Sequence, residues 1–249
     1  MTDETWKAKP AVSAWPEARA LEPSAVFWFA MFAASALGTN LGDFWARGLG
    51  LGLPASFASL VVITTASIAA DRRFGGASEI GFWIAIVFLR AMATNVGDAL
   101  THLGVSRLAS TPLLGAAALV AGYFTIAGGR AKASPRIDMR YWFAMFIAGA
   151  FGTVAGDLAA HDFGLTVASV ALSALLVIVI GVRSWAAPAS LLGYWCIVLA
   201  ERAAGTPVGD GLAEKRGLGY GLPVAMTITG AALLLALAFR ARMASPRKT

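Results

Sequence analysis

The sequence predicts an all-α integral membrane protein with eight transmembrane helices. The helices form four parallel two-helix repeats with pseudo-fourfold, twofold-of-twofolds symmetry. The composition supports this class, because 58% of the 249 residues are hydrophobic and only 14% are charged, whereas a soluble domain carries about 25% charged residues. Apolar stretches long enough to cross a bilayer core of about 30 Å recur along the whole chain. A motif that ends in Gly-Asp also recurs four times in the same context.

Eight apolar stretches are predicted as membrane spans, and they fall into pairs joined by short connections. The predicted spans are 25–46, 51–70, 80–101, 107–128, 140–160, 164–182, 190–211 and 219–240. Polar or basic loops separate the pairs, so that each pair constitutes one repeat. The predicted organisation is an N-terminal cytoplasmic tail (1–24), repeat 1 (25–76), repeat 2 (77–130), repeat 3 (131–187), and repeat 4 with a basic C-terminal tail (188–249).

The basic residues predict the orientation of the chain in the membrane. Fourteen Lys and Arg residues lie on the side that holds the termini and the inter-repeat loops, and four lie on the opposite side. Because positive charge accumulates in cytoplasmic loops, both termini are expected in the cytoplasm. This asymmetry also accounts for the net charge of +6, so no nucleic-acid partner is expected.

The repeated motif is the strongest signal in the sequence. The segments WFAMFAASALGTNLGD (28–43), WIAIVFLRAMATNVGD (83–98), WFAMFIAGAFGTVAGD (142–157) and WCIVLAERAAGTPVGD (195–210) all fit Trp-x10-Thr-x2-Gly-Asp without a gap. The repeated polar residues are Thr39, Thr94, Thr153 and Thr206, followed by Asp43, Asp98, Asp157 and Asp210. Repeats two and four also share an arginine eight residues before the aspartate, which suggests two successive duplications.

Helix geometry places these residues in the bilayer. With Trp as an interfacial anchor at the cytoplasmic start of each span, Thr lies roughly 16 Å and Asp roughly 22 Å further along the helix. Thr and Asp are four residues apart and share one helix face. The Gly before Asp and the small residue before Thr form an adjacent small-xxx-small face that permits close helix packing. The four Thr/Asp faces are therefore expected to meet at one axis, with the second helix of each pair outside.

Ionisable residues within the predicted spans point to a binding site. A charge at the centre of a span costs roughly 2.5–3.5 kcal/mol on insertion scales, so the aspartates should face the protein interior. Converging carboxylates repel one another unless a cation, protons or the arginines intervene. The Thr and Asp residues are predicted to bind an ion or substrate, and Arg90, Glu201 and Arg202 to form an internal charge network. The alternative is that Gly-Asp ends a helix and plays only a structural role.

Two histidines extend the candidate site. His102 and His161 each follow a motif aspartate by four residues and therefore lie on the same helix face. Asp98, His102, Asp157 and His161 are accordingly a candidate ligand set for a divalent metal. The alternative is that both histidines are ordinary solvated residues near the outer surface. The sequence leaves any cofactor unknown, and a divalent metal ion is a candidate substrate.

Four tandem two-span repeats, each with a Trp and a terminal Gly-Asp, resemble a bacterial membrane-protein family that is defined by such repeats and catalogued as of unknown function. The resemblance covers nearly all of the chain. It implies the fold and a location in the bacterial inner membrane, and it supplies no activity. A more distant similarity is to cation exchangers of the calcium/manganese type, whose repeats carry Glu-x-Gly-Asp-Lys/Arg-Thr/Ser. This chain has the Gly-Asp but lacks the preceding Glu and the following basic residue.

Three functions remain open at this point. The first is transport of a cation, including a divalent metal or a proton-coupled species, through the Thr/Asp site. The second is an anion or small-solute carrier that uses Arg90 and Arg202. The third is a membrane scaffold or signalling partner without transport. An enzyme is not expected, because the sequence offers no nucleophile with an oriented base. The expected partners are the lipid bilayer and a small cation or proton; the sequence leaves the oligomeric state open.

Overall fold

The computed structural model describes residues 23–74, 79–125, 135–186 and 190–244. Within these ranges the regular elements are all helices. They are α1 (Ala25–Asp43), which continues into a π-helical turn (Phe44–Gly48), α2 (Gly52–Phe74), α3 (Ile80–His102), α4 (Arg107–Tyr123), α5 (Met139–Phe163), α6 (Leu165–Ala186), α7 (Leu191–Ala213) and α8 (Leu222–Ala244). Most of the predicted N-terminal tail and the last five residues lie outside the described residues.

Six of the described helices are long and apolar enough to cross a membrane: α1 with its π-turn, α2, α3, α5, α6 and α8. Helix α4 is described over 17 residues, and α7 contains Glu201, Arg202 and Asp210. The chain is therefore a multi-pass helical membrane protein. The helix boundaries follow the predicted spans to within a few residues; α4 ends at Tyr123, and the last three residues of its predicted span, 126–128, lie outside the described residues.

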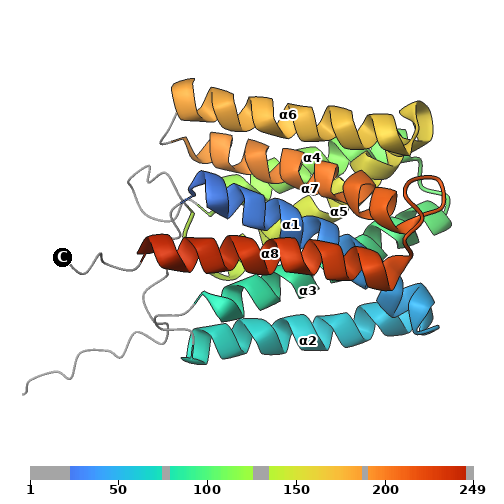
Figure 1. Cartoon of the computed structure of the whole chain (residues 1–249), viewed down its shortest axis with the longest axis horizontal. Coiled ribbons are helices and arrows are strands. Elements are labelled where there is room, and N and C mark those ends of the chain that lie inside the picture. The colour runs from blue at the N-terminus through green and yellow to red at the C-terminus, as the bar shows by residue number, and fades with distance from the viewer. Residues whose placement is uncertain (1–22, 75–78, 126–134, 187–189, 245–249) are drawn as a thin grey trace, which may run out of the picture.

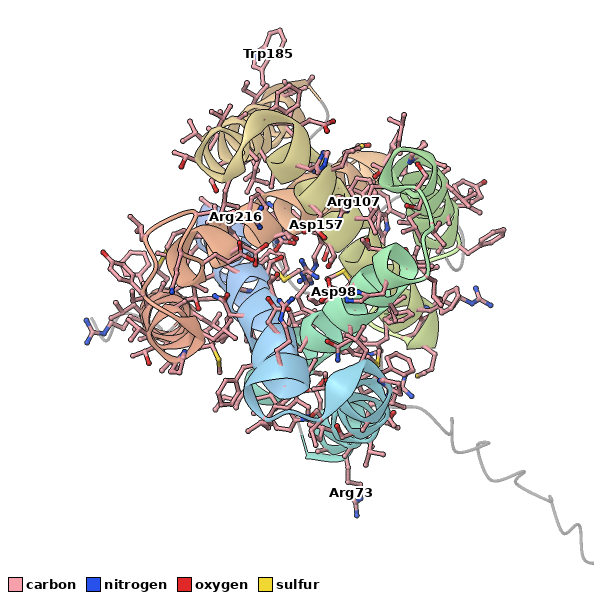
Figure 2. The ribbon with its side chains drawn as sticks, turned by 90° about the vertical axis from the view of Figure 1, so that its right-hand side faces the viewer. Arg73, Asp98, Arg107, Asp157, Trp185 and Arg216 are labelled. Carbon is pink, nitrogen blue, oxygen red and sulfur yellow. The ribbon has the colours of Figure 1, made fainter. Side chains whose placement is uncertain are left out.

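The first helices of the four repeats form an inner ring. Helix α1 packs against α3 and α7, and α5 also packs against α3 and α7. The outer helices surround this ring (Figures 1 and 2). The main partner of each outer helix is the inner helix of the next repeat, so that α2 packs on α3, α4 on α5 and α6 on α7, and α8 closes the circle on α1. The repeats are thus interlocked around a common centre.

Small residues let the inner helices approach closely. A Cβ atom on Gly38 would lie 2.6 Å from Cβ of Arg90, and one on Gly97 would lie 2.6 Å from Cβ of Thr153. Equivalent contacts join Gly152 to Arg202, Gly205 to Ser35, Gly42 to Thr94, and Gly156 to Thr206. The residue before each Thr and the Gly before each Asp therefore face the neighbouring inner helix, which confirms the predicted small-xxx-small packing.

The motif tryptophans lie inside the protein, which overturns their predicted role as interfacial anchors. Trp28, Trp83, Trp142 and Trp195 are at most 3% exposed. The residue before each Trp is also aromatic and buried, and it packs on the Trp of the next repeat. The ring centroids are 5.5 Å apart for Phe27 and Trp83, 5.6 Å for Phe82 and Trp142, 5.9 Å for Tyr141 and Trp195, and 5.1 Å for Tyr194 and Trp28. Because outer helices and neighbouring repeats cover these positions, the eight rings form an internal aromatic plug.

The two ends of the described chain meet beside this plug. Arg240 near the end of α8 binds Glu79 at the start of α3, with donor–acceptor distances of 2.8 and 3.0 Å. The same guanidinium donates to the hydroxyl of Ser24, the N-cap of α1, at 3.3 Å. This arrangement fastens the last repeat to the first two, at the end of the bundle where each motif begins.

Candidate functional site

A cavity of about 230 Å³ opens at the end of the inner ring opposite the aromatic plug. Figure 2 looks toward this end, with Asp98 and Asp157 beside the centre. All eight motif residues line the cavity: Thr39, Thr94, Thr153, Thr206, Asp43, Asp98, Asp157 and Asp210. The structure thus brings together every Thr and Asp that the sequence singled out. Their role in binding stays a prediction.

The lining residues form three levels, one helical turn apart. The threonines form the floor, and the aspartates lie roughly 6 Å above them, since four helical residues rise by that amount. The residues four positions after each Asp line the cavity mouth, and they differ between the repeats: Arg47, His102, His161 and Glu214. Repetition is therefore complete at the Thr and Asp levels and is lost at the entrance.

Three arginines at the cavity mouth were missed as site residues by the sequence analysis. Arg47, Arg107 and Arg216 all line the cavity, although sequence reasoning used them only to orient the chain. Sequence reasoning could have found them from their position, because these three arginines and Lys215 are the only basic residues in the connections at the end of the bundle that holds the cavity. The entrance therefore combines acidic and basic groups.

Two of the cavity carboxylates already have a cationic partner. Arg47 forms an ion pair with Asp43, one turn earlier. Arg216 donates to Glu214 through Nε at 3.0 Å and through Nη2 at 2.7 Å. This hydrogen bond and the charge of Glu214 raise the pKa of Arg216 above its ordinary value, so Arg216 stays charged and bound to that carboxylate.

The other three motif aspartates are unpaired. Among the residues that the structure describes, the carboxylates of Asp98, Asp157 and Asp210 take part in no ion pair and no side-chain hydrogen bond. All three face the same cavity from different inner helices. They are therefore available to protons or to a positively charged ligand.

Arg90 lies directly beneath the cavity floor and is 1% exposed. Its guanidinium donates to Thr94 Oγ1 at 2.8 Å, Thr153 Oγ1 at 2.8 Å, Thr206 Oγ1 at 2.7 Å, Ser35 Oγ at 3.2 Å and the Gly149 carbonyl at 3.2 Å. These acceptors come from all four inner helices. The side chain thus ties the centre of the ring together through hydroxyl and carbonyl oxygens, whereas the sequence analysis assigned it to a network with acidic groups.

Thr39 completes the threonine level without contacting Arg90. Its hydroxyl donates to the Ser35 carbonyl at 3.1 Å, within its own helix. Three of the four threonine hydroxyls are therefore engaged by a cation that belongs to the protein. In this state each of these three hydroxyl oxygens accepts a hydrogen bond from a guanidinium that belongs to the protein.

Glu201 and Arg202, two of the three residues predicted to form an internal charge network, form a buried ion pair. Arg202 Nε lies 3.4 Å from Glu201 Oε2, and both side chains are buried within the bundle. Neither residue lines the cavity. The two arginines at the same position of repeats two and four therefore have different surroundings.

The predicted metal ligands do not assemble. His102 Nδ1 lies 2.8 Å from the carbonyl oxygen of Asp98, and His161 Nδ1 lies 2.9 Å from the carboxylate of Asp162. Over the described residues, no group of three or more His, Cys, Asp or Glu side chains could hold a metal ion. Each imidazole is held by an oxygen of its own helix at the exposed mouth. The set Asp98, His102, Asp157 and His161 lines the cavity without forming a coordination shell.

Comparison with known proteins supports the family resemblance and adds no activity. No curated protein and no solved structure matches the chain. Residues 26–76 and 193–245, which cover most of the first and fourth repeats, match the family described as Repeat of Unknown Function (DUF347). Two of the four repeats of this multi-pass helical membrane protein therefore match a repeat family of unknown function.

Proposed function

We propose that the protein is a carrier that moves a small cation across the bacterial inner membrane, with the acidic cavity as its binding site. One observation carries the proposal: Asp98, Asp157 and Asp210 face a single cavity and have no partner among the residues that the structure describes. Ionisable groups at membrane depth are costly and mark ion and proton pathways by default. Three facing carboxylates reduce their mutual repulsion when they bind positive charge.

The closed floor supports a carrier more than an open channel. Arg90 and the threonines lie directly below the cavity, and the aromatic plug fills the opposite end of the inner ring. A cation could then pass only if the inner helices rearrange, as in transporters in which repeats move against one another around a central site. The structure would correspond to the state open on the cavity side.

The proposed topology has eight spans, four pseudo-symmetric repeats and both termini in the cytoplasm. The cyclic packing of outer helices on the next repeat supports the symmetry. The count of fourteen basic residues against four supports the orientation. In this topology the cavity opens away from the cytoplasm.

The cargo is proposed to be a proton-coupled or hydrated cation. A divalent metal ion would keep part of its water shell in this cavity, as Mg²⁺ does when few carboxylates bind it directly. A cavity of about 230 Å³ leaves room for such water. Protons are the simplest coupling ions, because the three unpaired carboxylates can take them up.

Anion transport through the arginines is the weaker hypothesis. The guanidinium of Arg90 already donates to five oxygen atoms of the protein, and Arg202 does not line the cavity. An anion entering from the mouth would have to pass the aspartates before it could reach Arg90. The scaffold hypothesis remains, and flux measurements separate it from transport.

The test is cation flux in proteoliposomes, with a panel of monovalent and divalent cations at two pH values. Asp98→Asn and Asp157→Asn are compared with the wild type. Asp162→Asn is the matched control, because Asp162 lies on the same helix as Asp157 but is exposed and outside the cavity. We expect flux of one cation or cation class, lost in both cavity variants and kept in the control.

The opposite result is equally clear. Absence of flux for every cation in a folded wild type would remove the carrier proposal. If the two cavity variants then differ from the wild type only in thermal stability, the aspartates have a structural role.

A further inference from the structure

The position eight residues before each motif aspartate lies next to the centre of the inner ring. It is occupied by Ser35, Arg90, Gly149 and Arg202 in repeats one to four. Gly149 has no side chain, and an added Cβ there would lie 3.8 Å from Cδ of Arg90. The short residues in repeats one and three therefore leave space for one long side chain to cross the centre.

Arg90 fills that space with a charge that has no acidic partner in contact. Its five bonds go to uncharged oxygens on four helices, and no ion pair with Arg90 is found among the described residues. The nearest element on the cavity side is the threonine floor, followed by the aspartates. A fixed positive charge thus lies where a cation leaving the cavity would have to pass.

We propose that Arg90 is the selectivity barrier of the transport path, a tethered cation that stops protons and metal ions from leaking through the threonine floor. This inference rests on the proposed function and deepens it, because it assigns the closure of the path to one side chain. Fixed positive charge in a narrow pore excludes protons and cations in other membrane proteins. The threonine hydroxyls accordingly hold the barrier in place and do not serve as ligands of the cargo in this state.

Arg202 provides an internal comparison. It occupies the same position of the motif on α7, across the ring from α3, and it is equally buried. Its side chain pairs with Glu201 and donates to none of the four threonines. A barrier that depends on position beneath the floor therefore requires Arg90 and not Arg202.

The experiment measures passive leak and does not require the cargo to be known. Proteoliposomes containing a pH-sensitive dye are given a membrane potential with a potassium gradient and valinomycin, and proton and Na⁺ entry are recorded. The variants are Arg90→Ala, Arg90→Gln, Arg90→Lys and, as the control, the double change Glu201→Gln with Arg202→Gln, which removes the second buried arginine without leaving Glu201 as an unpaired buried charge. Arg90→Gln keeps hydrogen-bond donors near the threonines without the charge, so it remains informative if Arg90→Ala does not fold.

We expect leak through the two neutral variants to exceed that of the wild type by on the order of a hundredfold, because removing a unit charge at close range in a poorly polarisable site strongly lowers the barrier to cations. The leak through Arg90→Lys and through the double control variant should equal that of the wild type. Millimolar guanidinium ion should reduce the leak of Arg90→Ala by occupying the vacated oxygen cage, which a merely structural defect would not show.

If Arg90→Gln is folded and monodisperse and leaks no more protons or Na⁺ than the wild type, Arg90 is not the barrier. Leak in the neutral variants without any wild-type cation flux would remove the proposed carrier and leave the barrier standing. If wild-type cation flux depends on Asp98 and Asp157 but the neutral Arg90 variants show no increased leak, the carrier proposal stands and the barrier proposal fails.

Discussion

Arg47 lies one helical turn after Asp43 and forms an ion pair with it at the cavity mouth. The first repeat therefore supplies its own cation, whereas the equivalent positions of the other repeats carry His102, His161 and Glu214. The pair competes with any cation that enters the cavity, because it occupies one of the four motif carboxylates.

Replacing this arginine should strengthen cation binding. In Arg47→Ala the carboxylate of Asp43 becomes available, and the affinity for the proposed cargo cation should rise by up to about fivefold, since a partly exposed ion pair is worth up to about 1 kcal/mol. The measurement is the cation concentration at half-maximal flux. Arg73→Ala, at the other end of the bundle, is the control; an unchanged or lower affinity in Arg47→Ala would contradict the prediction.

The aromatic plug offers a test by paired substitution. The hydroxyls of Tyr141 and Tyr194 lie 3.1 Å apart and are buried. Tyr194→Phe leaves the Tyr141 hydroxyl without this partner and should lower the free energy of unfolding by about 1–3 kcal/mol. The double change Tyr141→Phe with Tyr194→Phe reproduces the Phe-Trp pairs of repeats one and two, and should be nearly neutral. Thermal unfolding in detergent distinguishes the two, and an equal loss in both would argue against this account.

The glycine before each aspartate should tolerate no side chain. Gly97→Ala would place its Cβ 2.6 Å from Cβ of Thr153, and overpacking of this kind costs about 1–3 kcal/mol. Gly181→Ala on α6 is the matched control, because no atom lies within 4 Å of its added Cβ and alanine is the better helix former. We expect a lower melting temperature for the first variant and an equal or higher one for the second. Equal behaviour would mean that the inner helices are more loosely packed than described.

Comparison of the repeats also predicts a stabilising change. Asn95 donates to Ser56 on the outer helix that covers it, whereas the side chain of Asn40, one repeat earlier, is buried without a hydrogen bond. The position on α8 that corresponds to Ser56 is Ala225, which follows its helix-starting Pro by the same two residues. Ala225→Ser should therefore raise the free energy of unfolding by about 1 kcal/mol. The gain should vanish when Asn40→Ala is added, and its persistence there would locate the effect elsewhere.

The sequence was sufficient for the inner ring because its signal is repeated. Identical spacing of Thr39 and Asp43 with their three counterparts predicts a shared face, and small residues at fixed offsets predict close packing of the helices that carry it. Both expectations depend on helix geometry alone, so the structure places these residues as the motif indicates.

The sequence did not predict features that depend on which other helices pack against a given helix. Trp28 has the position of an interfacial anchor when its span is considered alone, and it is buried because aromatic side chains of the inner helices, Phe27 and Tyr194, pack against it. Arg90 was expected to meet carboxylates, but its direction is set by the absence of a side chain at Gly149 on a neighbouring helix. The arginines at the mouth are individually unremarkable in the sequence and become site residues only because three helix connections converge on the cavity.

The cyclic packing of the repeats bears on how such a protein could arise and be rebuilt. Each outer helix rests on the next inner helix, and the last contact, α8 on α1, is of the same kind as the others. Since Ser24 and Arg240 lie within hydrogen-bonding distance, the position of the chain break is arbitrary with respect to the fold. A circular permutant that begins at repeat two and joins the old termini should keep every helix contact. A chain of only two repeats would expose two complementary surfaces, and it would reach the same closed ring through head-to-tail assembly of two copies.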